Sequence, residues 1–464
     1  MFDRPIEVYE FGEFQLDVGE RTLERRRERE RIVVPEKAFG TLVHLVRNSG
    51  ALVTTEAILA AVWPGVVVED GNVAKVIHII RSALGDRSGE WTYIETVPKH
   101  GYRFIAEVAC IGKTASAAPS AAPFLRAVVR GRSPAYDLYI RGKVKAGSEN
   151  IDDTNEAIAL LEAAVGLDSS YAEAYAQLAR AYNTRSFKFA SQAEGRRFRE
   201  NADVALAKAL DLDPNLAEAH FVRGLVLWTK AKGFPHEQAI RSFKKALELA
   251  PDADETHHQL SMVYSHVGLL EDARSHVAQA IDLNPNNTMA RFRVGVYMAW
   301  QCRFEDALAV LKTVPSDVSP FLVDRMRAEV YVQLGRLDKA GPIVDGFLAG
   351  HPADEGGSLT GVRALLLAKA GEAREARTMI ARAIELGTGF GHFHHTAYNI
   401  AATCAALQEP DEAVDWIEAA ADDGFPCYPY FERDPNLDAL RGYPRFVDLM
   451  SQLHRQWKHF KQVA

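Results

Sequence analysis

The stretch from Pro251 to Pro285, PDADETHHQLSMVYSHVGLLEDARSHVAQAIDLNP, decides the fold of most of this 464-residue chain. Apolar and small residues recur at helical spacing on both sides of Gly268, which predicts two antiparallel helices joined by a tight turn. Small residues let two helices approach closely, and a proline has no N–H with which to continue the second helix. The landmarks of this unit are Leu260, Tyr264, Gly268, Ala273, Ala280 and Pro285.

The same register recurs from residue 136 to residue 420, in roughly eight copies. One copy ends at Pro214 and carries extra residues, which we place in its turn around Phe187–Arg197. The landmarks resemble those of the tetratricopeptide (TPR) repeat, a helix pair that stacks on its neighbours because one pair cannot bury its own apolar face. The alternative is an Ala-rich helical bundle with accidental periodicity, and the phase shared by successive copies argues against it.

The first hundred residues follow a different pattern. Alternating apolar and polar residues predict strands, helical spacing predicts three helices, and a pair of short strands around Pro98–Gly101 predicts a closing hairpin. The expected strands are Tyr9–Asp17, Thr22–Glu28, Arg31–Val34, Trp91–Glu95 and Tyr102–Val108; the expected helices start at Pro35, Thr54 and Glu69, and the third ends at Leu84.

Four passages of this segment, VPEKAFGTLVHLVRNSGALVTTEAIL, AVWPGVVVEDGNV, IRSALGD and TVPKHGYRF, resemble the DNA-binding domain of OmpR/PhoB-type regulators. The resemblance implies a winged helix whose third helix enters the major groove and whose hairpin tip reaches the minor groove of double-stranded promoter DNA. It also implies that the segment Trp63–Asp70 contacts RNA polymerase. Positions 78, 79 and 82, often basic or hydroxylic in that family, are His, Ile and Ser here.

The third helix can also be interpreted from its own spacing. At 100° per residue one apolar face must be buried, and it comprises Val73, Val76, Ile77, Ile80 and Leu84. The other side offers hydrogen-bonding groups suited to phosphates and base edges. The expected DNA contacts are Asn72, Lys75, His78, Arg81 and Ser82 on the helix and Lys99, His100 and Arg103 on the hairpin. The alternative is an ordinary solvated face, with Arg103 pinning the hairpin through an ion pair.

The charge of this segment counts against tight DNA binding. Residues 1–110 hold 14 Lys and Arg against 17 Asp and Glu, and the whole chain has a net charge of −8. Phosphate neutralisation supplies most non-specific affinity for DNA. The run ERRRERER from Glu24 to Arg31 alternates its signs and suits the solvated edge of a strand. We therefore expect weak binding as a monomer, with occupancy that depends on paired half-sites bound by a homodimer or on a co-regulator.

Composition shifts predict four segments: a winged-helix domain at 1–110, a flexible Ala/Ser/Pro linker at 111–135, the repeats at 136–420 and a capping segment at 421–464. Because the winged-helix pattern starts close to residue 1, we expect no receiver domain before it. No apolar run approaches the ~20 residues of a membrane helix. The four cysteines are far apart and there is no signal-peptide pattern, which together predict a cytoplasmic protein without membrane contact.

In the TPR family the first helix of each pair lines a concave groove. Carried onto this chain, the groove is apolar and aromatic in its middle and suits a peptide or an effector. The expected groove residues are Arg180, Asn183, Phe221, Leu225, Trp228, His258, Met262, Phe292, Val296 and Arg325. The alternative is that these side chains pack against a neighbouring repeat or against the chain's own C-terminal segment.

No nucleotide-binding or metalloprotease motif occurs, and we expect neither a cofactor nor an enzymatic activity. Histidines at 392, 394 and 395 lack a Cys or acidic partner at ligand spacing, so we interpret them as solvated residues at a helix start and expect no metal. The predicted fold is mainly α, with an N-terminal α+β winged helix and a C-terminal α-solenoid. The predicted function is a one-component transcriptional regulator. The alternative is a TPR scaffold whose winged helix no longer binds DNA.

Overall fold

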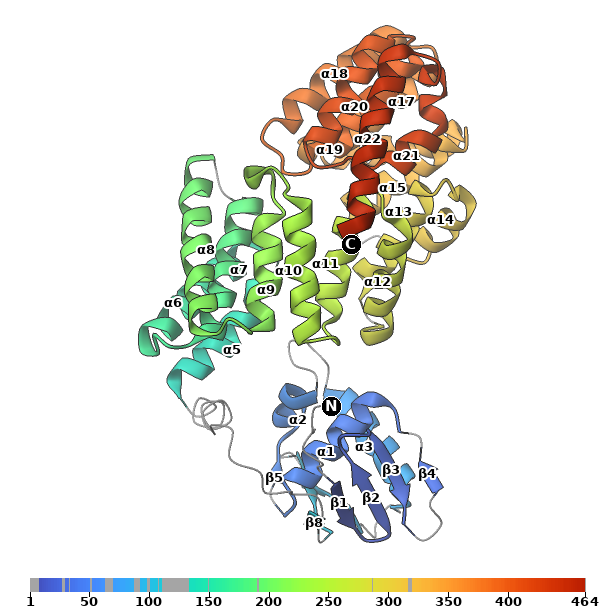
Figure 1. Cartoon of the computed structure of the whole chain (residues 1–464). Helices are drawn as coiled ribbons and strands as arrows, with labels where there is room; N and C mark the ends of the chain where they lie inside the picture. Colours follow the sequence, from blue (N-terminus) through green and yellow to red (C-terminus); the bar gives the residue numbers. More distant parts are fainter. Residues whose placement is uncertain are drawn as a thin grey trace. The chain divides into compact units, whose positions relative to one another are not determined.

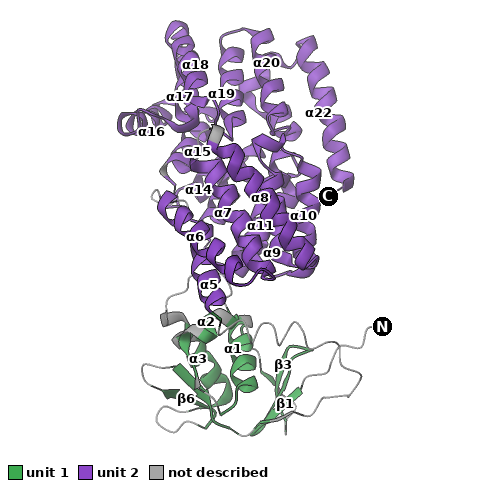
Figure 2. Cartoon of the chain, turned by 90° about the vertical axis from the view of Figure 1, so that its left-hand side faces the viewer, with its two compact units in different colours: residues 1–133 green, residues 134–464 purple. Residues whose placement is uncertain are grey.

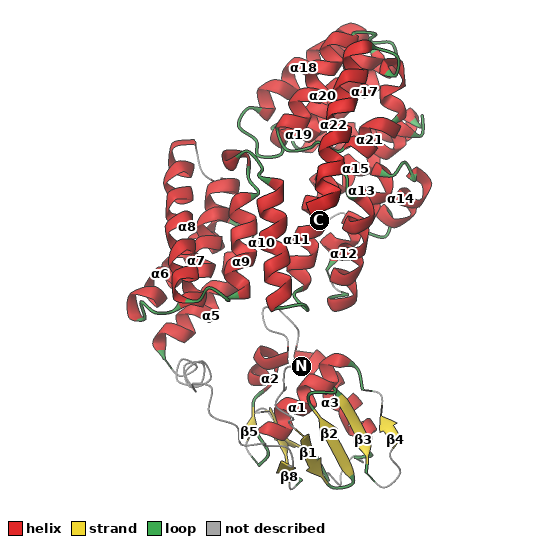
Figure 3. Cartoon of the chain, in the orientation of Figure 1, coloured by secondary structure: helices red, strands yellow, loops and turns green. Residues whose placement is uncertain are grey.

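The computed structural model describes residues 8–26, 30–32, 34–50, 52–62, 70–86, 92–97, 101–106, 108–110, 133–148, 150–189, 192–285, 287–315 and 319–463 (Figure 1). The chain divides into two compact units, Met1–Ser133 and Pro134–Ala464 (Figure 2). Strands occur in the first unit, whereas the second is built from helices (Figure 3). No helix in the described ranges is both long enough and apolar enough to cross a membrane.

The first unit contains a five-stranded antiparallel sheet in the order β4-β3-β2-β1-β8. Its strands are β1 (Val8–Phe11), β2 (Phe14–Asp17), β3 (Thr22–Arg25), β4 (Glu30–Ile32) and β8 (Val108–Cys110). The prediction of a single strand over Tyr9–Asp17 is wrong, because the chain reverses at Gly12 and pairs Phe11 with Phe14. Gly12 has a φ of 52°, and a Cβ there would lie 2.5 Å from the Tyr93 hydroxyl.

A second sheet of three strands, in the order β5-β7-β6, forms the hairpin side of the unit. It comprises β5 (Leu52–Val53), β6 (Ile94–Val97) and β7 (Gly101–Phe104), with Thr96 paired with Tyr102. The expected strand over Tyr102–Val108 is therefore two strands in different sheets: β7 ends at Phe104, and β8 pairs with β1 instead. The single alternating run in the sequence could not reveal this change of partner.

Within the described residues of this unit, three helices accompany the sheets: α1 (Glu36–Arg47), α2 (Thr55–Val62) and α3 (Asp70–Leu84). The core between helices and strands is closed by an aromatic cluster, in which the Phe11 and Phe104 rings lie 5.0 Å apart and the Phe14 and Tyr93 rings 5.4 Å apart. The order of strands, three helices and a hairpin is that of a winged helix, as the sequence predicted.

The second unit contains, within the described ranges, eight successive antiparallel helix pairs. They are α5 (Pro134–Ala146) with α6 (Ile151–Leu167), α7 (Ala172–Phe189) with α8 (Gln192–Leu212), α9 (Ala217–Leu227) with α10 (His236–Leu249), α11 (Asp254–His266) with α12 (Leu270–Leu283), α13 (Thr288–Trp300) with α14 (Phe304–Leu311), α15 (Pro320–Gln333) with α16 (Leu337–Gly350), α17 (Ser358–Lys369) with α18 (Ala373–Gly387) and α19 (Phe393–Ala406) with α20 (Pro410–Asp422).

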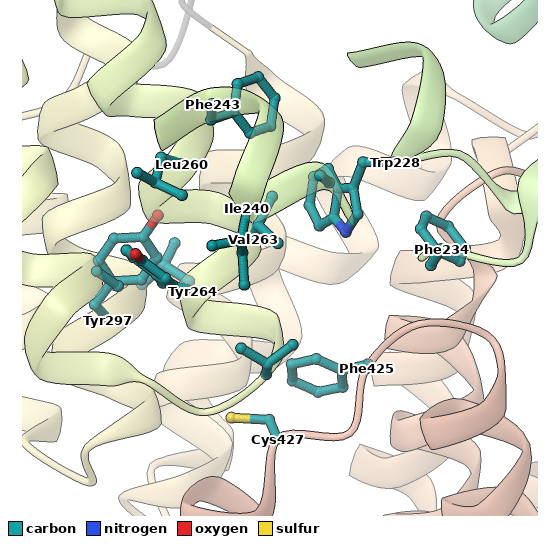
Figure 4. Packing of buried hydrophobic residues seen from close by; sticks show 14 of the residues in the cluster. Trp228, Phe234, Ile240, Phe243, Leu260, Val263, Tyr264, Tyr297, Phe425 and Cys427 are labelled. Carbon is teal, nitrogen blue, oxygen red and sulfur yellow. The ribbon is translucent and has the colours of Figure 1, made fainter. Parts of the chain in front are cut away.

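The small landmark residues lie where the two helices of a pair touch. A Cβ added to Gly224 of α9 would lie 2.5 Å from the ring of Phe243 on α10, and one added to Gly295 would lie 2.8 Å from Leu311. Successive pairs then share buried clusters: one extends through most of the unit, and a second lies mainly among α15, α16 and α17. Figure 4 shows Phe243 of α10 and Leu260 and Tyr264 of α11 within the first cluster. Gly224 and Gly295 are therefore contact positions within a pair, whereas Gly268 lies in its turn with a φ of 79° and faces Pro429.

The extra residues of the second pair do not form the long turn that we expected around Phe187–Arg197. They lengthen both helices instead, so that α7 has 18 residues and α8 has 21. Ser186 near the end of α7 donates a hydrogen bond to the Gly195 carbonyl of α8 at 2.9 Å, which holds the two extensions together. The two helices therefore extend into a segment that we had predicted to be a turn.

The last segment comprises α21 (Tyr428–Arg433), η4 (Pro435–Leu440) and α22 (Pro444–Val463). Phe425, Phe431 and Phe446 are buried, consistent with a cover over the final repeat. The segment also contacts much earlier repeats: the Trp457 indole N–H donates to the Gly268 carbonyl at 3.0 Å, and the Phe460 ring lies 5.9 Å from His236. It therefore joins the last repeat to the third and fourth ones as well as covering the end.

Candidate nucleic-acid interface and repeat interior

Helix α3 has one face in the core and one face outward within its unit. Val73, Ile77 and Ile80 are almost completely buried, as predicted from helical spacing. Ile79 is 37% exposed and Ser82 is exposed, so the side opposite the core is open at these positions. The backbone of α3 places positions 72, 75 and 78 on its outward side by spacing, but the side chains of Asn72, Lys75 and His78 lie outside the described part of the chain.

Arg81 occupies the junction between α3 and the hairpin. Its Nη2 donates to the Ile94 carbonyl and to the Thr96 hydroxyl, both at 2.8 Å, and its Nε lies 3.3 Å from the same carbonyl. Burial lowers the pKa of its guanidinium. These contacts join α3 to β6. Arg81, expected to reach DNA, is therefore engaged inside the unit and sets the position of the hairpin relative to α3.

The other basic hairpin residues divide into two groups. Arg103 Nη1 lies 3.1 Å from Glu95 Oε2 across the β6–β7 pair, so the ion pair that we raised as an alternative is present. Lys99 and His100 at the hairpin tip lie outside the described residues. The strength of an exposed pair of this kind is small, about 0–1 kcal/mol. Its contribution is to orient Arg103 along the strand rather than to stabilise the fold.

Sequence reasoning missed Asp86, which organises the start of the hairpin. One carboxylate accepts the backbone N–H groups of Thr92, Tyr93 and Ile94, at 2.8 Å, 3.1 Å and 3.0 Å. Asp86 lies two residues after the end of α3, so it fixes the path of the chain back to the sheet. The available signal was the Gly85-Asp86 pair after an apolar helix, which is a common helix-stop pattern.

The apolar groove residues are mostly covered in the structure. Phe221, Trp228, Phe292 and Val296 are buried, and Leu225 and Met262 are partly buried. The Trp228 indole N–H donates to His236 Nδ1 at 3.0 Å. Packing against neighbouring repeats, the alternative raised from the sequence, therefore accounts for these four buried side chains.

The polar groove residues lie at different depths. Arg180 of α7 donates to the Glu255 carboxylate of α11, with one contact at 3.0 Å, and links two repeats; Asn183, one turn later on α7, is half-buried. Arg325 of α15 is only 4% exposed, and its guanidinium lies 3.9 Å from the carboxylate of Glu329. Glu329 is itself engaged by the Asn399 amide at 2.9 Å. Arg325 is thus a buried cation with a distant counter-ion.

Arg293 adds a second buried cation to this interior, and His258 adds a neutral ring. The Nε atoms of Arg293 and Arg325 and the Nε2 atom of His258 are buried without a hydrogen-bond partner among the described residues. Burial, and to a smaller extent the charge of Arg325, lowers the pKa of Arg293. Burial and the charge of Arg293 lower the pKa of His258 to about 3, which keeps its imidazole neutral. The arrangement offers buried donors and positive charge to an anionic group.

The histidines of the GHFHH stretch are not solvated, so that prediction is wrong. His394 is fully buried, and His392 and His395 are half-buried among the aromatic side chains of the repeats. The His395 ring lies 5.0 Å from Phe425, and the His266 ring lies 4.9 Å from Trp228. The C-terminal segment and the third and fourth repeats enclose them (Figure 4 labels Trp228, Phe234 and Phe425 at this place). Their burial results from contacts between distant segments, which helical spacing does not encode.

Comparison with known proteins agrees with this division. Residues 29–104 match the family model of the transcriptional regulatory protein C-terminal domain. No curated protein was found to match the chain. Among solved structures, the first unit is similar to the DNA-binding domain of RstA from Klebsiella pneumoniae bound to the RstA box, with 26% identity, a TM-score of 0.19, and coverage of 21% of this chain and 96% of that one.

Two further solved structures are similar to parts of this chain. The DNA-binding domain of CadC from E. coli is 22% identical, with a TM-score of 0.21, and covers 24% of this chain and 100% of its own. A thermophilic TPR protein of Thermus thermophilus is 25% identical, with a TM-score of 0.31, over 38% of this chain and 87% of that one. Because these TM-scores are low, the assignments rest on the family model, the repeat landmarks and the geometry above.

The first unit is therefore an OmpR/PhoB-type winged helix, and the second is a TPR solenoid. A segment that matches a transcription-regulator family model and a stack of eight helix pairs within the described ranges are thus joined in one chain.

Proposed function

We propose that this protein is a sequence-specific, one-component transcriptional regulator. Helix α3 enters the major groove of promoter DNA, and the β6–β7 hairpin lies along the neighbouring backbone or minor groove. The observation that carries the proposal is the amphipathic α3, buried through Val73, Ile77 and Ile80 and open at Ile79 and Ser82, within a segment that matches the regulator family model. Asn72, Lys75, His78 and Ser82 are the proposed contacts of this helix, and Lys99, His100 and Arg103 those of the hairpin.

The repeats are proposed to bind the controlling ligand, a peptide or effector that carries an anionic group. Support comes from the interior of the second unit, where the Nε atoms of Arg293 and Arg325 and the Nε2 atom of His258 are buried with no hydrogen-bond partner in the part of the chain that the structure describes. An unpaired buried donor costs about 1–3 kcal/mol, which a carboxylate or phosphate would recover by accepting from it. The buried Phe292 and Val296 then support this surface from behind rather than contact the ligand.

The proposal extends to polymerase contact, oligomeric state, location and catalysis, and only the polymerase contact comes from the family resemblance. The segment Trp63–Asp70, which apart from Asp70 lies outside the described residues, contacts RNA polymerase. Two copies bind paired half-sites as a homodimer, which offsets the net charge of −3 on residues 1–110. The protein acts in the cytoplasm, where bacterial promoters lie, and it has no catalytic activity.

The competing function is an interaction scaffold whose winged helix has lost its DNA affinity, and the acidic balance of residues 1–110 favours it. Titration of the full chain with genomic fragments that it selects, at low and moderate salt, separates the two. A regulator binds with an affinity that falls as salt rises, because bound cations are released from the phosphates. A scaffold shows no binding that saturates at either salt concentration.

The matched variants are Lys75→Ala with His78→Ala on α3, and Lys208→Ala on the exposed surface of α8 as the control for loss of charge. We expect the α3 double variant to bind roughly 10-fold or more weakly, which corresponds to at least ~1.4 kcal/mol. The control should bind as the unchanged protein does. Equal affinity of the double variant and the unchanged protein would contradict the proposed role of α3.

A further inference from the structure

Three histidines from distant parts of the second unit bring their ring nitrogens together. His266 ends α11, His392 precedes α19, and His394 lies in the first turn of α19. One nitrogen from each ring lies within 4.8 Å of the other two. We propose that His266, His392 and His394 form a binding site for a divalent transition-metal ion of the zinc class. This site is independent of the proposed DNA-binding role.

The hydrogen bonds of two rings fix which nitrogen is free. His266 Nδ1 lies 2.8 Å from the Met262 carbonyl, and His394 Nδ1 lies 2.7 Å from the Asp423 carbonyl. A carbonyl oxygen only accepts, so each Nδ1 carries the proton and each Nε2 carries a lone pair. Metal-binding histidines are commonly oriented by a carbonyl in this way. Two lone pairs are therefore held in place before any ion arrives.

One of these nitrogens, His266 Nε2, makes no hydrogen bond to the described residues. His266 is 2% exposed, and its Nε2 is buried without a hydrogen-bond partner among the described residues. An unsatisfied buried polar atom costs about 1–3 kcal/mol. A metal ion that accepted this lone pair would remove the cost. The alternative, a simple hydrogen bond between His392 Nδ1 and His394 Nε2, leaves His266 Nε2 unexplained.

The spacing of the second and third nitrogens fits one ion. Zinc–nitrogen bonds are about 2.0–2.1 Å long, so two nitrogens of a tetrahedral site lie roughly 3.3 Å apart. His392 Nδ1 and His394 Nε2 are 3.4 Å apart. The nitrogen of His266 lies within 4.8 Å of the other two, so it must move closer to them to complete a trigonal set. Three imidazoles suit zinc, copper, nickel or cobalt and disfavour magnesium and calcium, which prefer oxygen ligands.

Charges around the site predict what occupies the fourth position. Arg293 and Arg325 lie close enough to His392 to oppose a positive charge on its ring. The same repulsion acts on a dication, and three neutral imidazoles do not offset it. Asp423, whose Oδ2 is 3.9 Å from His394 Nδ1, is already paired with Lys230 at 3.1 Å and therefore offsets little of it. We therefore expect an anion, such as hydroxide or a carboxylate, to complete the coordination.

A second group of candidate ligands, Cys404, Glu409 and Glu412, carries less weight. Arg377 already donates to both carboxylates, with a contact of 2.8 Å to Glu412. Binding an ion there would require these charge-assisted bonds to break. In the histidine site, by contrast, His266 Nε2 is unpaired, and the bond between His392 and His394 at 3.4 Å is at the limit of hydrogen bonding.

The test uses the full chain, stripped of metal by a chelator and titrated with Co²⁺, whose visible absorption intensifies in a tetrahedral site. We expect one equivalent of Co²⁺ to give this spectrum and Zn²⁺ to displace it. His266→Gln and His392→Gln should weaken binding at least about 10-fold, because each removes one ligand. His257→Gln on the same helix α11 and Cys404→Ala are the controls, and both should bind as the unchanged protein does.

Thermal unfolding gives a second readout. An ion that binds only the folded chain raises the Tm as the ion concentration increases. In the proposed site the bound ion would also join α11 to α19. The proposal is overturned if the unchanged protein gives no tetrahedral Co²⁺ spectrum, if His392→Gln retains full affinity, or if only Cys404→Ala abolishes binding. Circular dichroism checks that each variant is folded. Should His266→Gln fail to fold, the half-buried His392→Gln decides the outcome.

Discussion

At the scale of single residues, the structure shows which polar side chains already have hydrogen-bond partners inside the winged helix. Arg81 looked like a base-reading arginine in the sequence, yet its guanidinium donates to Ile94 and Thr96. Asp86, which had no assigned role, gathers three backbone N–H groups at the start of the hairpin. Both residues fix the position of β6 relative to α3. They would therefore shape the proposed DNA-binding surface without contacting DNA themselves.

The first prediction concerns Arg81. Arg81→Ala removes donors from the Ile94 carbonyl and the Thr96 hydroxyl, at a cost of about 1–3 kcal/mol to local stability. We expect backbone amides at 92–97 to exchange hydrogen faster by a matching factor, roughly 5- to 150-fold. The measurement is hydrogen exchange of the full chain followed by mass spectrometry.

Ser82→Ala, at an exposed position one residue further along α3, is the control for that experiment. It should leave exchange at 92–97 unchanged. Unchanged exchange in Arg81→Ala as well would show that the hairpin is held without this residue.

At the scale of secondary-structure elements, the repeat landmarks act as contact points between helices. Gly224 of α9 lies against the Phe243 ring of α10, and Gly142 of α5 lies against Leu161 of α6 in the same way. The same contact, between a glycine on the first helix and a large apolar side chain on the second helix of a pair, therefore recurs along the unit. The helix pairs could be predicted because this contact is local in sequence.

The second prediction tests that contact. Gly224→Ala places a Cβ 2.5 Å from the Phe243 ring, so the ring or the helices must move, at a cost of about 1–3 kcal/mol. We expect the Tm of the helical unit to fall. Gly346→Ala in α16 is the matched control, since nothing lies within 4 Å of its added Cβ.

The control variant should be neutral or more stable by up to about 1 kcal/mol, because alanine is the better helix former. Far-UV circular dichroism during heating measures both variants. The same Tm for Gly224→Ala and Gly346→Ala would refute the contact as the origin of the landmark.

At the scale of the whole molecule, the C-terminal segment changes what the second unit encloses. Trp457 and Phe460 of α22 contact Gly268 and His236, which lie far earlier in the chain. These contacts, with Phe425, help to enclose several histidines from separate repeats. Burial lowers the pKa of His236 to about 4 and, together with the charge of Arg293, that of His258 to about 3.

The third prediction is the pH dependence of stability. Both folded-state pKa values lie below the unfolded value of about 6.5, so the unfolded chain binds more protons as the pH falls. The contribution of these histidines to the free energy of unfolding is therefore fully present above pH ~6.5. It decreases towards pH ~4, by about 1.4 kcal/mol per pH unit for each such histidine. Urea unfolding of the full chain between pH 7 and pH 5 measures the slope.

His258→Gln should remove the contribution of one histidine from that slope. Gln452→Ala, at an exposed position of α22 that does not titrate, is the control and should leave the slope unchanged. An identical slope in His258→Gln and the unchanged protein would show that His258 does not contribute to the pH dependence.

The sequence alone determined the two kinds of domain, the phase of the repeats and the buried face of α3. These features depend on residues within one or two helical turns, or within one helix pair, and local spacing specifies which face each side chain takes. Only the tertiary structure decided that α22 returns to the third and fourth repeats, that Phe292 and Val296 are covered, and that His266 meets His392 and His394. Such contacts depend on the rotation of each helix pair against the next, summed over many pairs. The spacing of nearby residues does not encode these small rotations.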